Sequence, residues 1–250
     1  SYNQATVRLG IATGMEALLE ILVEFGIEER PPAYPSLLLG ALDLSPFEVA
    51  GLYSTLANDG FRTPLTAVRS VVDTKGQPLS RTALEVEQVA DPNAVHQLNR
   101  GLVEVMRRGT GRSSAAYLPE GLVVAGKTGT SDDLRDSWFA GFSGDHLAVV
   151  WIGRDDNQPT GLTGAAGALT VWAPMIAAMS STTSYDPAYS ADLQPMWIDY
   201  DTGLKSRRGC GNAVQILVPE GARLGRQPGC SNVLGEIGER VRDVIESLGN

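Results

Sequence analysis

Residues that hold metal ions are scarce in this 250-residue sequence, and so are long apolar runs. Its two histidines, His96 and His146, are far apart and lack ligand-like neighbours, so the sequence gives little support for a metal site. No apolar run approaches the roughly 20 residues that a membrane-spanning helix needs. No signal peptide is visible either, so the sequence does not reveal its own targeting.

Positive charge and cysteine are also scarce. The chain has 20 Lys and Arg against 29 Asp and Glu, which gives a net charge of −9. A phosphate backbone would be repelled by that balance, so we expect no nucleic-acid partner. The two cysteines, Cys210 and Cys230, lie in a Gly- and Pro-containing stretch near the C-terminus. Their number fits a disulfide in an oxidising compartment, but composition alone fits two unrelated buried thiols equally well.

Two helices are predicted in the first sixty residues. Residues 15–25 have apolar side chains at helical spacing and glutamates on the opposite side, and Gly26 is a suitable terminator. Ser45-Pro46-Phe47-Glu48 combines a capping serine, a proline at the first helical position and a glutamate three residues after the cap, which predicts a helix to about Asn58. The apolar face expected for the first helix consists of Met15, Leu18, Leu19, Leu22 and Val23.

Two more helices are predicted further along. One opens at Asp91-Pro92 and ends at Arg107-Arg108, with Gly109 as its cap. The other covers about residues 164–179 and should kink at Pro174. The apolar faces expected for these helices are Val95, Leu98, Leu102, Val105 and Met106 for the first, and Leu169, Trp172, Ile176 and Met179 for the second.

Short apolar runs separated by Gly and Asp predict strands. They cover residues 122–125, 137–142 and 147–152, and Gly144-Asp145 joins the last two closely, which favours an antiparallel hairpin. Residues 66–73 are also β-prone and are followed by a turn at 74–76. Helices followed by antiparallel strands and a closing helix predict an α+β layered domain.

The composition changes near Ser180 and divides the chain. We expect a main domain over residues 1–180, a polar linker over 181–195 and a small C-terminal extension over 196–250. The extension holds both cysteines and ends in a helical pattern from about Val233 to Leu248.

The most informative segment is Lys127-Thr128-Gly129-Thr130, which ends an apolar strand and follows Gly126. Acyl transfer from a peptide with a free carboxylate needs a cation and hydroxyl donors for that carboxylate, and an amide N–H for the developing oxyanion. These residues on a strand edge can supply all three, and glycines on both sides of Lys127 leave room for the substrate. A surface strand ending in a Lys-Thr-Gly turn is the alternative, and a three-residue match by itself favours it.

Lys127-Thr128-Gly129 is also the third of three motifs shared by penicillin-binding proteins and class A β-lactamases. Ser1-Tyr2-Asn3 resembles the second motif, Ser-x-Asn. Four further segments resemble class A, bifunctional penicillin-binding proteins in the family's order, so that the resemblance covers about residues 1–180: Leu44–Ala50, Ala57–Gly60, Gly109–Gly111 and Asp136–Phe142. The tail, with Met196–Asp199 and the two cysteines, more loosely resembles the C-terminal extension of the 1b group from Gram-negative bacteria.

The resemblance implies a β-lactamase/transpeptidase-like α+β fold, with an antiparallel sheet packed between helices and a small C-terminal extension. It also implies catalytic roles for three residues. Ser1 would relay protons to the leaving group, Asn3 would hold the side-chain amide of the donor peptide, and Lys127 would supply positive potential. Thr128-Gly129-Thr130 would bind the substrate or a β-lactam through its carboxylate, and the Thr130 N–H would form half of the oxyanion hole.

The first motif of the family, Ser-x-x-Lys, is absent from this chain. The residues three positions before the three lysines Lys75, Lys127 and Lys205 are Val72, Val124 and Thr202. In this family the missing motif supplies the acylated serine and its general base. We therefore expect the nucleophile, the glycosyltransferase domain and the membrane anchor to lie in an upstream segment of the same protein.

The implied function is D,D-transpeptidation, in which peptidoglycan stem peptides ending in D-Ala-D-Ala are cross-linked through a serine acyl-enzyme that β-lactam antibiotics mimic. No cofactor is implied, and cell-wall synthesis regulators are candidate partners. The implied location, the periplasmic face of the inner membrane, is oxidising and favours a bridge between Cys210 and Cys230. Two alternatives stay open: a β-lactamase or D,D-carboxypeptidase that passes the acyl group to water, and a non-catalytic penicillin-binding sensor module.

The remaining conspicuous residues have ordinary structural explanations. Trp138, Trp151 and Trp172 are expected in the core. Asp132-Asp133 and Asp155-Asp156 are expected in solvated turns and not as an acid/base pair.

Overall fold

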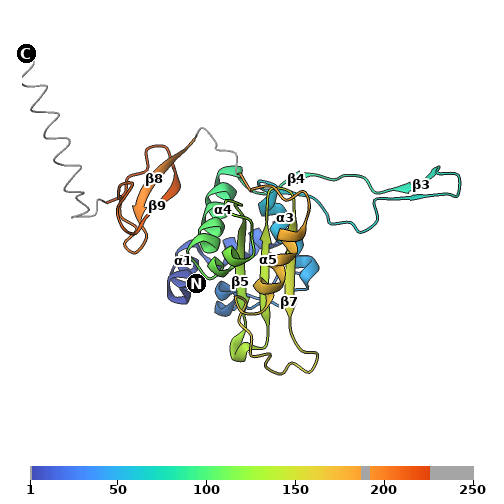
Figure 1. Cartoon of the computed structure of the whole chain (residues 1–250), viewed down its shortest axis with the longest axis horizontal. Coiled ribbons are helices and arrows are strands. Elements are labelled where there is room, and N and C mark those ends of the chain that lie inside the picture. The colour runs from blue at the N-terminus through green and yellow to red at the C-terminus, as the bar shows by residue number, and fades with distance from the viewer. Residues whose placement is uncertain (1, 187–191, 226–250) are drawn as a thin grey trace, which may run out of the picture. The chain divides into compact units, whose positions relative to one another are not determined.

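The computed structural model describes residues 2–186 and 192–225 and divides the chain into two compact units, residues 1–188 and 189–250 (Figure 1). Each unit is described by itself. Among the described residues, no helix has both the length and the apolar character that a membrane span requires.

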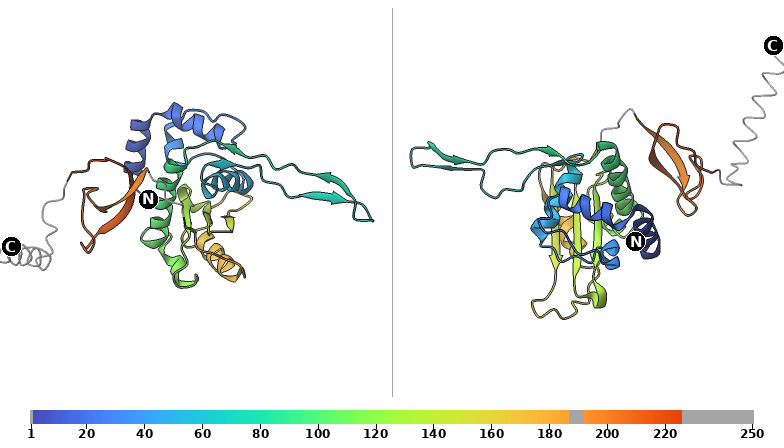
Figure 2. Two further views of the ribbon diagram at one scale, coloured as in Figure 1. Left: turned by 90° about the horizontal axis from the view of Figure 1, so that it is seen from above. Right: turned by 180° about the vertical axis from the view of Figure 1, so that it is seen from behind.

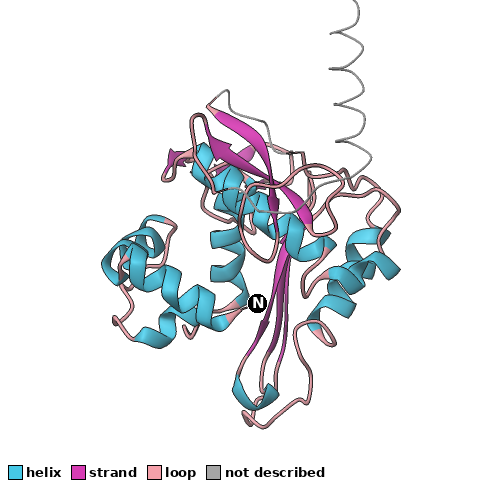
Figure 3. Ribbon diagram, turned by 90° about the vertical axis from the view of Figure 1, so that its left-hand side faces the viewer, coloured by secondary structure: helices cyan, strands magenta, loops and turns pink. Residues whose placement is uncertain are grey.

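The centre of the first unit is a three-stranded sheet in the order β5-β6-β7. The strands are Ala125–Thr130, Ser137–Phe142 and Leu147–Ile152, and both neighbouring pairs are antiparallel. Figure 3 shows them as long magenta ribbons lying side by side. The predicted hairpin at Gly144-Asp145 is confirmed, with Phe142 opposite Leu147 at its closed end. The first strand begins later than predicted and includes the whole Lys-Thr-Gly-Thr segment.

Helices cover both faces of this sheet, and each face has its own hydrophobic core. Helices α3 (Pro46–Ala57) and α4 (Pro92–Arg107) pack on one side, and α5 (Ala168–Ala178) packs on the other (Figure 2). Because strand side chains alternate between faces, Phe139 and Phe142 of β6 point to opposite sides. Phe139 packs on Trp172 of α5, whereas Phe142 lies in the core of α3 and α4. The predicted α+β fold, with its antiparallel sheet between helices, is confirmed.

The two predicted helix starts have the side-chain caps that the sequence indicates. Ser45 Oγ accepts from the Glu48 N–H at 3.2 Å, and Glu48 Oε2 accepts from the Ser45 N–H at 2.7 Å, which completes the capping box. Asp91 Oδ1 accepts from the N–H groups of Asn93 and Ala94 at the start of α4.

The buried face of α4 differs from the prediction. Leu98 is 52% exposed, whereas two polar residues, His96 and Asn99, are buried. Both polar side chains have partners: His96 Nε2 lies 3.0 Å from Asp59 Oδ1, and Asn99 Nδ2 donates to the Leu56 carbonyl. These hydrogen bonds offset part of the cost of burying the two side chains, and the buried face of α4 is rotated relative to the predicted one.

At the N-terminal end lie α1 (Asn3–Thr13), α2 (Met15–Glu24) and the short 3-10 helix η1 (Pro35–Leu39). The α2 prediction is confirmed, including Gly26 at its end, where φ is +105°. Its apolar face is narrower than expected, because Val23 is 41% exposed. The sequence pattern missed α1, whose apolar residues Leu9 and Ile11 are exposed and give no helical stripe.

A two-stranded arm extends from the first unit between α3 and α4 (Figure 1). Its outer strands are β2 (Ser70–Val72) and β3 (Pro78–Arg81), and the short strands β1 (Phe61–Arg62) and β4 (Glu87–Gln88) pair at its base. The predicted turn is confirmed. Asp73 Oδ1 accepts from the N–H groups of Lys75 and Gln77, both at 2.8 Å.

The start of α5 differs from the prediction. The helix begins at Ala168 and not at 164, because residues 164–167 form a glycine-containing turn against the sheet.

Trp172 is fully buried as predicted, but Trp151 is 41% exposed, so its placement in the core was wrong. Its indole N–H donates to Asp136 Oδ1 at the sheet surface, which satisfies the polar end of the ring. Asp132-Asp133 and Asp155-Asp156 are exposed as expected, the first pair in the single 3-10 turn Asp132–Leu134, where Asp133 has φ +58°, and the second pair in a turn.

The boundary between the units, at residues 188/189, falls within the linker expected over 181–195. Residues 182–185 belong to the first unit, where Tyr185 is buried in the α3/α4 core and its N–H donates to the Val123 carbonyl. The second unit contains β8 (Leu193–Asp199) and β9 (Ala213–Pro219), paired antiparallel, so the last residues assigned to the linker lie in a strand. Cys230 and the predicted helix at 233–248 lie outside the described residues.

Candidate active site

The candidate site is built on β5, which among the described residues is an edge strand of its sheet. The Ser131 N–H donates to the Asp136 carbonyl just beyond the paired region. In an antiparallel ladder, hydrogen-bonded pairs alternate with pairs whose backbone groups point outward. Ser131 is therefore a hydrogen-bonded position, and counting back from it in steps of two makes Gly129 and Lys127 hydrogen-bonded to β6 as well. The N–H and C=O groups of Thr128 and Thr130 therefore face the open edge.

The side chain of Lys127 gives independent evidence that the Thr128 carbonyl points to the open edge of β5. Its ammonium donates to the outward-facing Thr128 carbonyl at 2.8 Å, which keeps the positive charge at the open edge of β5. The side chain is half-buried, and burial lowers the pKa of its ammonium below the ordinary value of 10.5. A desolvated cation at this edge attracts an incoming carboxylate more strongly than a lysine in bulk water.

The two threonine hydroxyls of the segment are each fixed by a neighbour from a distant part of the chain. Thr128 Oγ1 lies 2.6 Å from Thr110 Oγ1, which follows α4. Thr130 Oγ1 accepts from the Gly164 N–H at 2.9 Å, and Gly164 belongs to the turn before α5. An oxygen that accepts in this way keeps its own proton available for a ligand.

The glycines of the site are needed for close packing of the backbone, whereas the sequence suggested that they leave room for the substrate. A Cβ on Gly126 would lie 2.6 Å from the Phe139 ring, and one on Gly129 would lie 2.9 Å from the Trp138 Cβ. A Cβ on Gly164 would lie 2.5 Å from the Gly129 carbonyl oxygen. These glycines therefore let β5, β6 and the turn at 164 pack closely, and any space for substrate is a secondary consequence.

Comparison with known proteins identifies the family to which this chain belongs. The profile of the penicillin binding protein transpeptidase domain matches residues 1–169. The chain belongs to this transpeptidase family.

Curated relatives of the family match over most of this chain. The chain is 38% identical over 218 residues to penicillin-binding protein 1B of Escherichia coli, covering 87% of this chain and 25% of that protein. It is 43% identical over 176 residues to penicillin-binding protein 1B of Vibrio cholerae, covering 69% of this chain and 22% of that protein. The chain thus spans about a quarter of the length of these relatives.

Solved structures of the family share the fold. Penicillin-binding protein 1A from Haemophilus influenzae matches with a TM-score of 0.79 at 21% identity, covering 91% of this chain and 40% of that one. The penicillin G acyl-enzyme complex of penicillin-binding protein A from Mycobacterium tuberculosis matches with a TM-score of 0.53 at 26% identity, covering 70% of this chain and 46% of that one.

The structure brings together only part of the predicted transpeptidase site. Lys127, Thr128, Gly129 and Thr130 are contiguous on β5. Asn3 is exposed at the start of α1, and Ser1 lies outside the described residues. Sequence reasoning did not assign roles to Thr110 or Gly164. Gly109-Thr110-Gly111 is one of the family-like segments of the sequence, so the sequence does signal Thr110, but not the contact that it makes.

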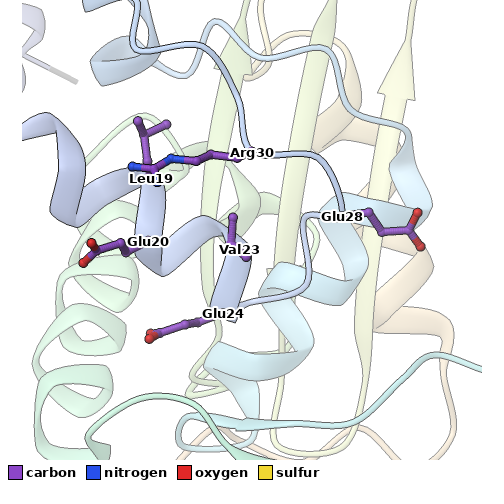
Figure 4. Close-up of a pocket in the computed structure, with 6 residues that line it drawn as sticks. All are labelled: Leu19, Glu20, Val23, Glu24, Glu28 and Arg30. Carbon is purple, nitrogen blue, oxygen red and sulfur yellow. The ribbon is translucent and has the colours of Figure 1, made fainter.

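A surface pocket of about 320 Å³ is formed by α2 and the segment that follows it, without a residue of β5 in its lining (Figure 4). Its lining residues are Leu19, Glu20, Val23, Glu24, Glu28 and Arg30. Arg30 forms an ion pair with Glu16. None of these residues belongs to the predicted transpeptidase site, and the three glutamates are exposed side chains of α2 and of the segment after it.

Proposed function

We propose that the complete protein is a D,D-transpeptidase that cross-links peptidoglycan stem peptides through a serine acyl-enzyme, and that β-lactams acylate the same serine. The observation that carries the proposal is the open edge of β5, where a half-buried ammonium, two threonine hydroxyls and an outward-facing Thr130 N–H lie on one strand. Membership of the transpeptidase family supports it.

The first half of the reaction forms the acyl-enzyme. The serine of the upstream Ser-x-x-Lys motif attacks the carbonyl carbon between the two D-alanines of a donor peptide. Its proton passes to the lysine of that motif and then, through Ser1, to the nitrogen of the departing D-alanine. The Thr130 N–H donates to the carbonyl oxygen as it becomes negative, and one such donor contributes roughly 3–4 kcal/mol to transition-state binding.

The same strand positions the donor peptide. Lys127 attracts the C-terminal carboxylate, while the hydroxyl protons of Thr128 and Thr130 donate to its oxygens. Asn3 holds a side-chain amide further along the peptide. The amine of a second stem peptide then attacks the ester carbon, the bond to the serine oxygen breaks, and a proton from the amine passes to that oxygen, which frees the serine and leaves the cross-link.

The family resemblance also supports the location and partners proposed for the complete protein. We place it at the periplasmic face of the inner membrane, with an upstream segment that supplies the anchor and the nucleophile. Stem peptides ending in D-Ala-D-Ala and β-lactam antibiotics are the proposed ligands, and cell-wall synthesis regulators are further proposed partners.

Product analysis separates this proposal from its alternatives. The complete protein is incubated with a donor pentapeptide and an acceptor peptide, and the products are identified by mass spectrometry. A transpeptidase forms cross-linked dimer together with one D-alanine per cross-link. D-alanine released without dimer would identify a carboxypeptidase, continuous hydrolysis of penicillin would identify a β-lactamase, and binding of penicillin without a covalent adduct would identify a sensor module.

A further inference from the structure

Thr110 lies 18 residues before Thr128 in the chain, yet its side-chain oxygen is only 2.6 Å from that of Thr128. Thr110 belongs to the turn that follows α4, whereas Thr128 is in the middle of β5. Thr110 is exposed, so its hydroxyl is not explained by a need to satisfy a buried group. The contact instead joins the end of a helix to the open edge that carries the candidate site.

The turn that holds Thr110 is fixed against the last turn of α4. The Gly109 N–H donates to the Val105 carbonyl at 3.0 Å, and the Gly111 N–H donates to the same carbonyl at 3.1 Å. A Cβ on Gly109 would lie 2.9 Å from that oxygen, and one on Gly111 would lie 2.5 Å from Met106 Sδ. Only glycines on both sides allow this close approach, and Met106 is itself anchored in the core.

The hydroxyl pair has a simple proton count. Two hydroxyls carry two protons, and one proton is used in the bond between them. The other remains for a third group, and hydrogen bonding within the pair both orients it and strengthens it as a donor. A carboxylate, which only accepts, is the ligand that matches a fixed donor beside the Lys127 ammonium.

We propose that Thr110 is a positioning residue of the transpeptidase site, which orients the Thr128 hydroxyl toward the carboxylate of the donor peptide or of a β-lactam. The inference rests on the proposed function, because it assigns a role within that same site. It adds a side chain from the α4–η2 turn, where η2 is the 3-10 helix Arg112–Ala116, to the wall formed by β5.

The test uses the complete protein and measures the second-order rate of acylation by benzylpenicillin and by its methyl ester, in which the carboxylate is masked. Thr110→Val keeps the shape of the side chain and removes the hydroxyl, whereas Thr110→Ser keeps the hydroxyl. We expect Thr110→Val to slow acylation by the free acid about tenfold, as expected for losing one hydrogen bond to a charged group. We expect Thr110→Ser to stay within about twofold of wild type, since its donor is retained.

The ester and a second variant separate positioning from a structural effect. Reaction with the ester is slow in the wild type and should be unchanged by Thr110→Val. In a Thr128→Val background, Thr110→Val should have no further effect, because the two hydroxyls act as one unit. Matching thermal unfolding curves of the variants show that each is folded.

Each outcome bears on one of the two proposals. A Thr110→Val rate equal to wild type, an equal loss for acid and ester, or an equal loss in Thr110→Ser overturns the positioning role while leaving the proposed function intact. Failure of the folded wild-type protein to be acylated at all overturns the proposed function, and the positioning role with it.

Discussion

Lys127 meets two opposing demands. In the proposed mechanism a substrate carboxylate requires the charged ammonium, but burial lowers the pKa of Lys127 and so makes that charged form less favourable in the folded protein. Below the folded pKa, both the folded and the unfolded chain hold the proton, and the burial penalty is fully present. As the pH rises through the folded pKa, the folded chain releases its proton first, the unfolded chain binds more protons, and stability rises.

Replacing this lysine should therefore separate stability from activity. Lys127→Met keeps the apolar stem and removes the charge. At pH 7 its free energy of unfolding should equal or exceed that of the wild type, and the difference should shrink as the pH rises above the folded pKa of Lys127. Acylation by benzylpenicillin should fall about a hundredfold, as for other lost electrostatic donors. Lower stability at pH 7 with unchanged acylation would contradict this account, and Lys75→Met in the exposed arm is the control.

At the scale of single residues, the sequence located the candidate site residues but not the residues that support them. The four residues Lys127–Thr130 are adjacent in the chain, so a short motif can reveal them. Thr110 and Gly164 reach them only after α4 and the turn before α5 have packed on the sheet. No local pattern records such a contact, which is why both were missed as site residues.

Asn99 illustrates the same limit inside the core. Its side-chain amide donates to the Leu56 carbonyl at 2.7 Å and to the Tyr185 hydroxyl at 2.8 Å, so it joins α3, α4 and the segment after α5. Burial raises the pKa of Tyr185 to about 12, so the hydroxyl stays protonated at neutral pH. A pattern of apolar residues assigns a buried face by hydrophobicity and therefore passes over such a residue.

Replacing Asn99 should have a clear cost. Asn99→Leu leaves the Leu56 carbonyl and the Tyr185 hydroxyl without their donor, and we expect a loss of about 2 kcal/mol in the free energy of unfolding, measured by denaturant titration. Tyr185→Phe in the Asn99→Leu background should recover part of that loss. Gln97→Leu, on the exposed side of the same helix, should stay within about 0.5 kcal/mol of wild type. Equal effects at positions 97 and 99 would contradict this role.

At the scale of elements, the two helix starts with side-chain caps were predicted best, because capping is local. Ser45 and Glu48 are three residues apart and satisfy each other's backbone donors. Hydrogen bonds from Ser45 lower the pKa of the Glu48 carboxyl. The stabilisation is therefore present above the ordinary carboxyl pKa and is lost as the pH falls through the folded value.

The cap of α3 gives an element-scale prediction. Ser45→Ala should lower the free energy of unfolding by about 1 kcal/mol at pH 7. Glu48→Gln should lose the contribution that depends on its charge, so its difference from wild type should disappear at a pH below the folded pKa of Glu48. Thermal unfolding at pH 7 and at acidic pH measures both effects. A Glu48→Gln difference that persists unchanged in acid would contradict the role of the charge.

Element boundaries were less predictable where tertiary packing decides them. Gly164 and Gly167 look like the start of α5 in sequence, but the Gly164 N–H is used by Thr130 Oγ1. A Cβ on Gly167 would lie 2.5 Å from Ser137 Oγ. Contact with the sheet therefore outweighs continuation of the helix, and α5 begins at Ala168.

At the scale of the whole chain, the boundary between the two units, at residues 188/189, falls within the linker expected over 181–195, but the first residues of that segment are not a free linker. The polar run at 180–184 looks like a linker because its residues are small and hydroxylated. Several of them are bound to the first unit: the Thr183 N–H donates to Asp145 Oδ1 at 3.0 Å, and Ser184 Oγ accepts from the Val123 N–H at 3.1 Å. Polar composition therefore does not distinguish a linker from a segment held by hydrogen bonds.

The second unit carries a prediction about its cysteines. We expect Cys210 and Cys230 to form a disulfide, which would stabilise this unit by roughly 3 kcal/mol in the chain-entropy model for a loop of about 20 residues. Peptide mapping of non-reduced protein should find the two cysteine peptides linked. Two free thiols in protein isolated from an oxidising compartment would contradict the prediction, and Cys210→Ser should lower the unfolding temperature of this unit alone.

The most direct test of the whole account is covalent labelling of the complete protein with a fluorescent penicillin. We expect a labelled band on a denaturing gel that disappears after preincubation with unlabelled benzylpenicillin and is strongly reduced in Lys127→Met. A complete protein that is folded by circular dichroism and still shows no label would contradict the assignment of β5 as one wall of a penicillin-reactive active site.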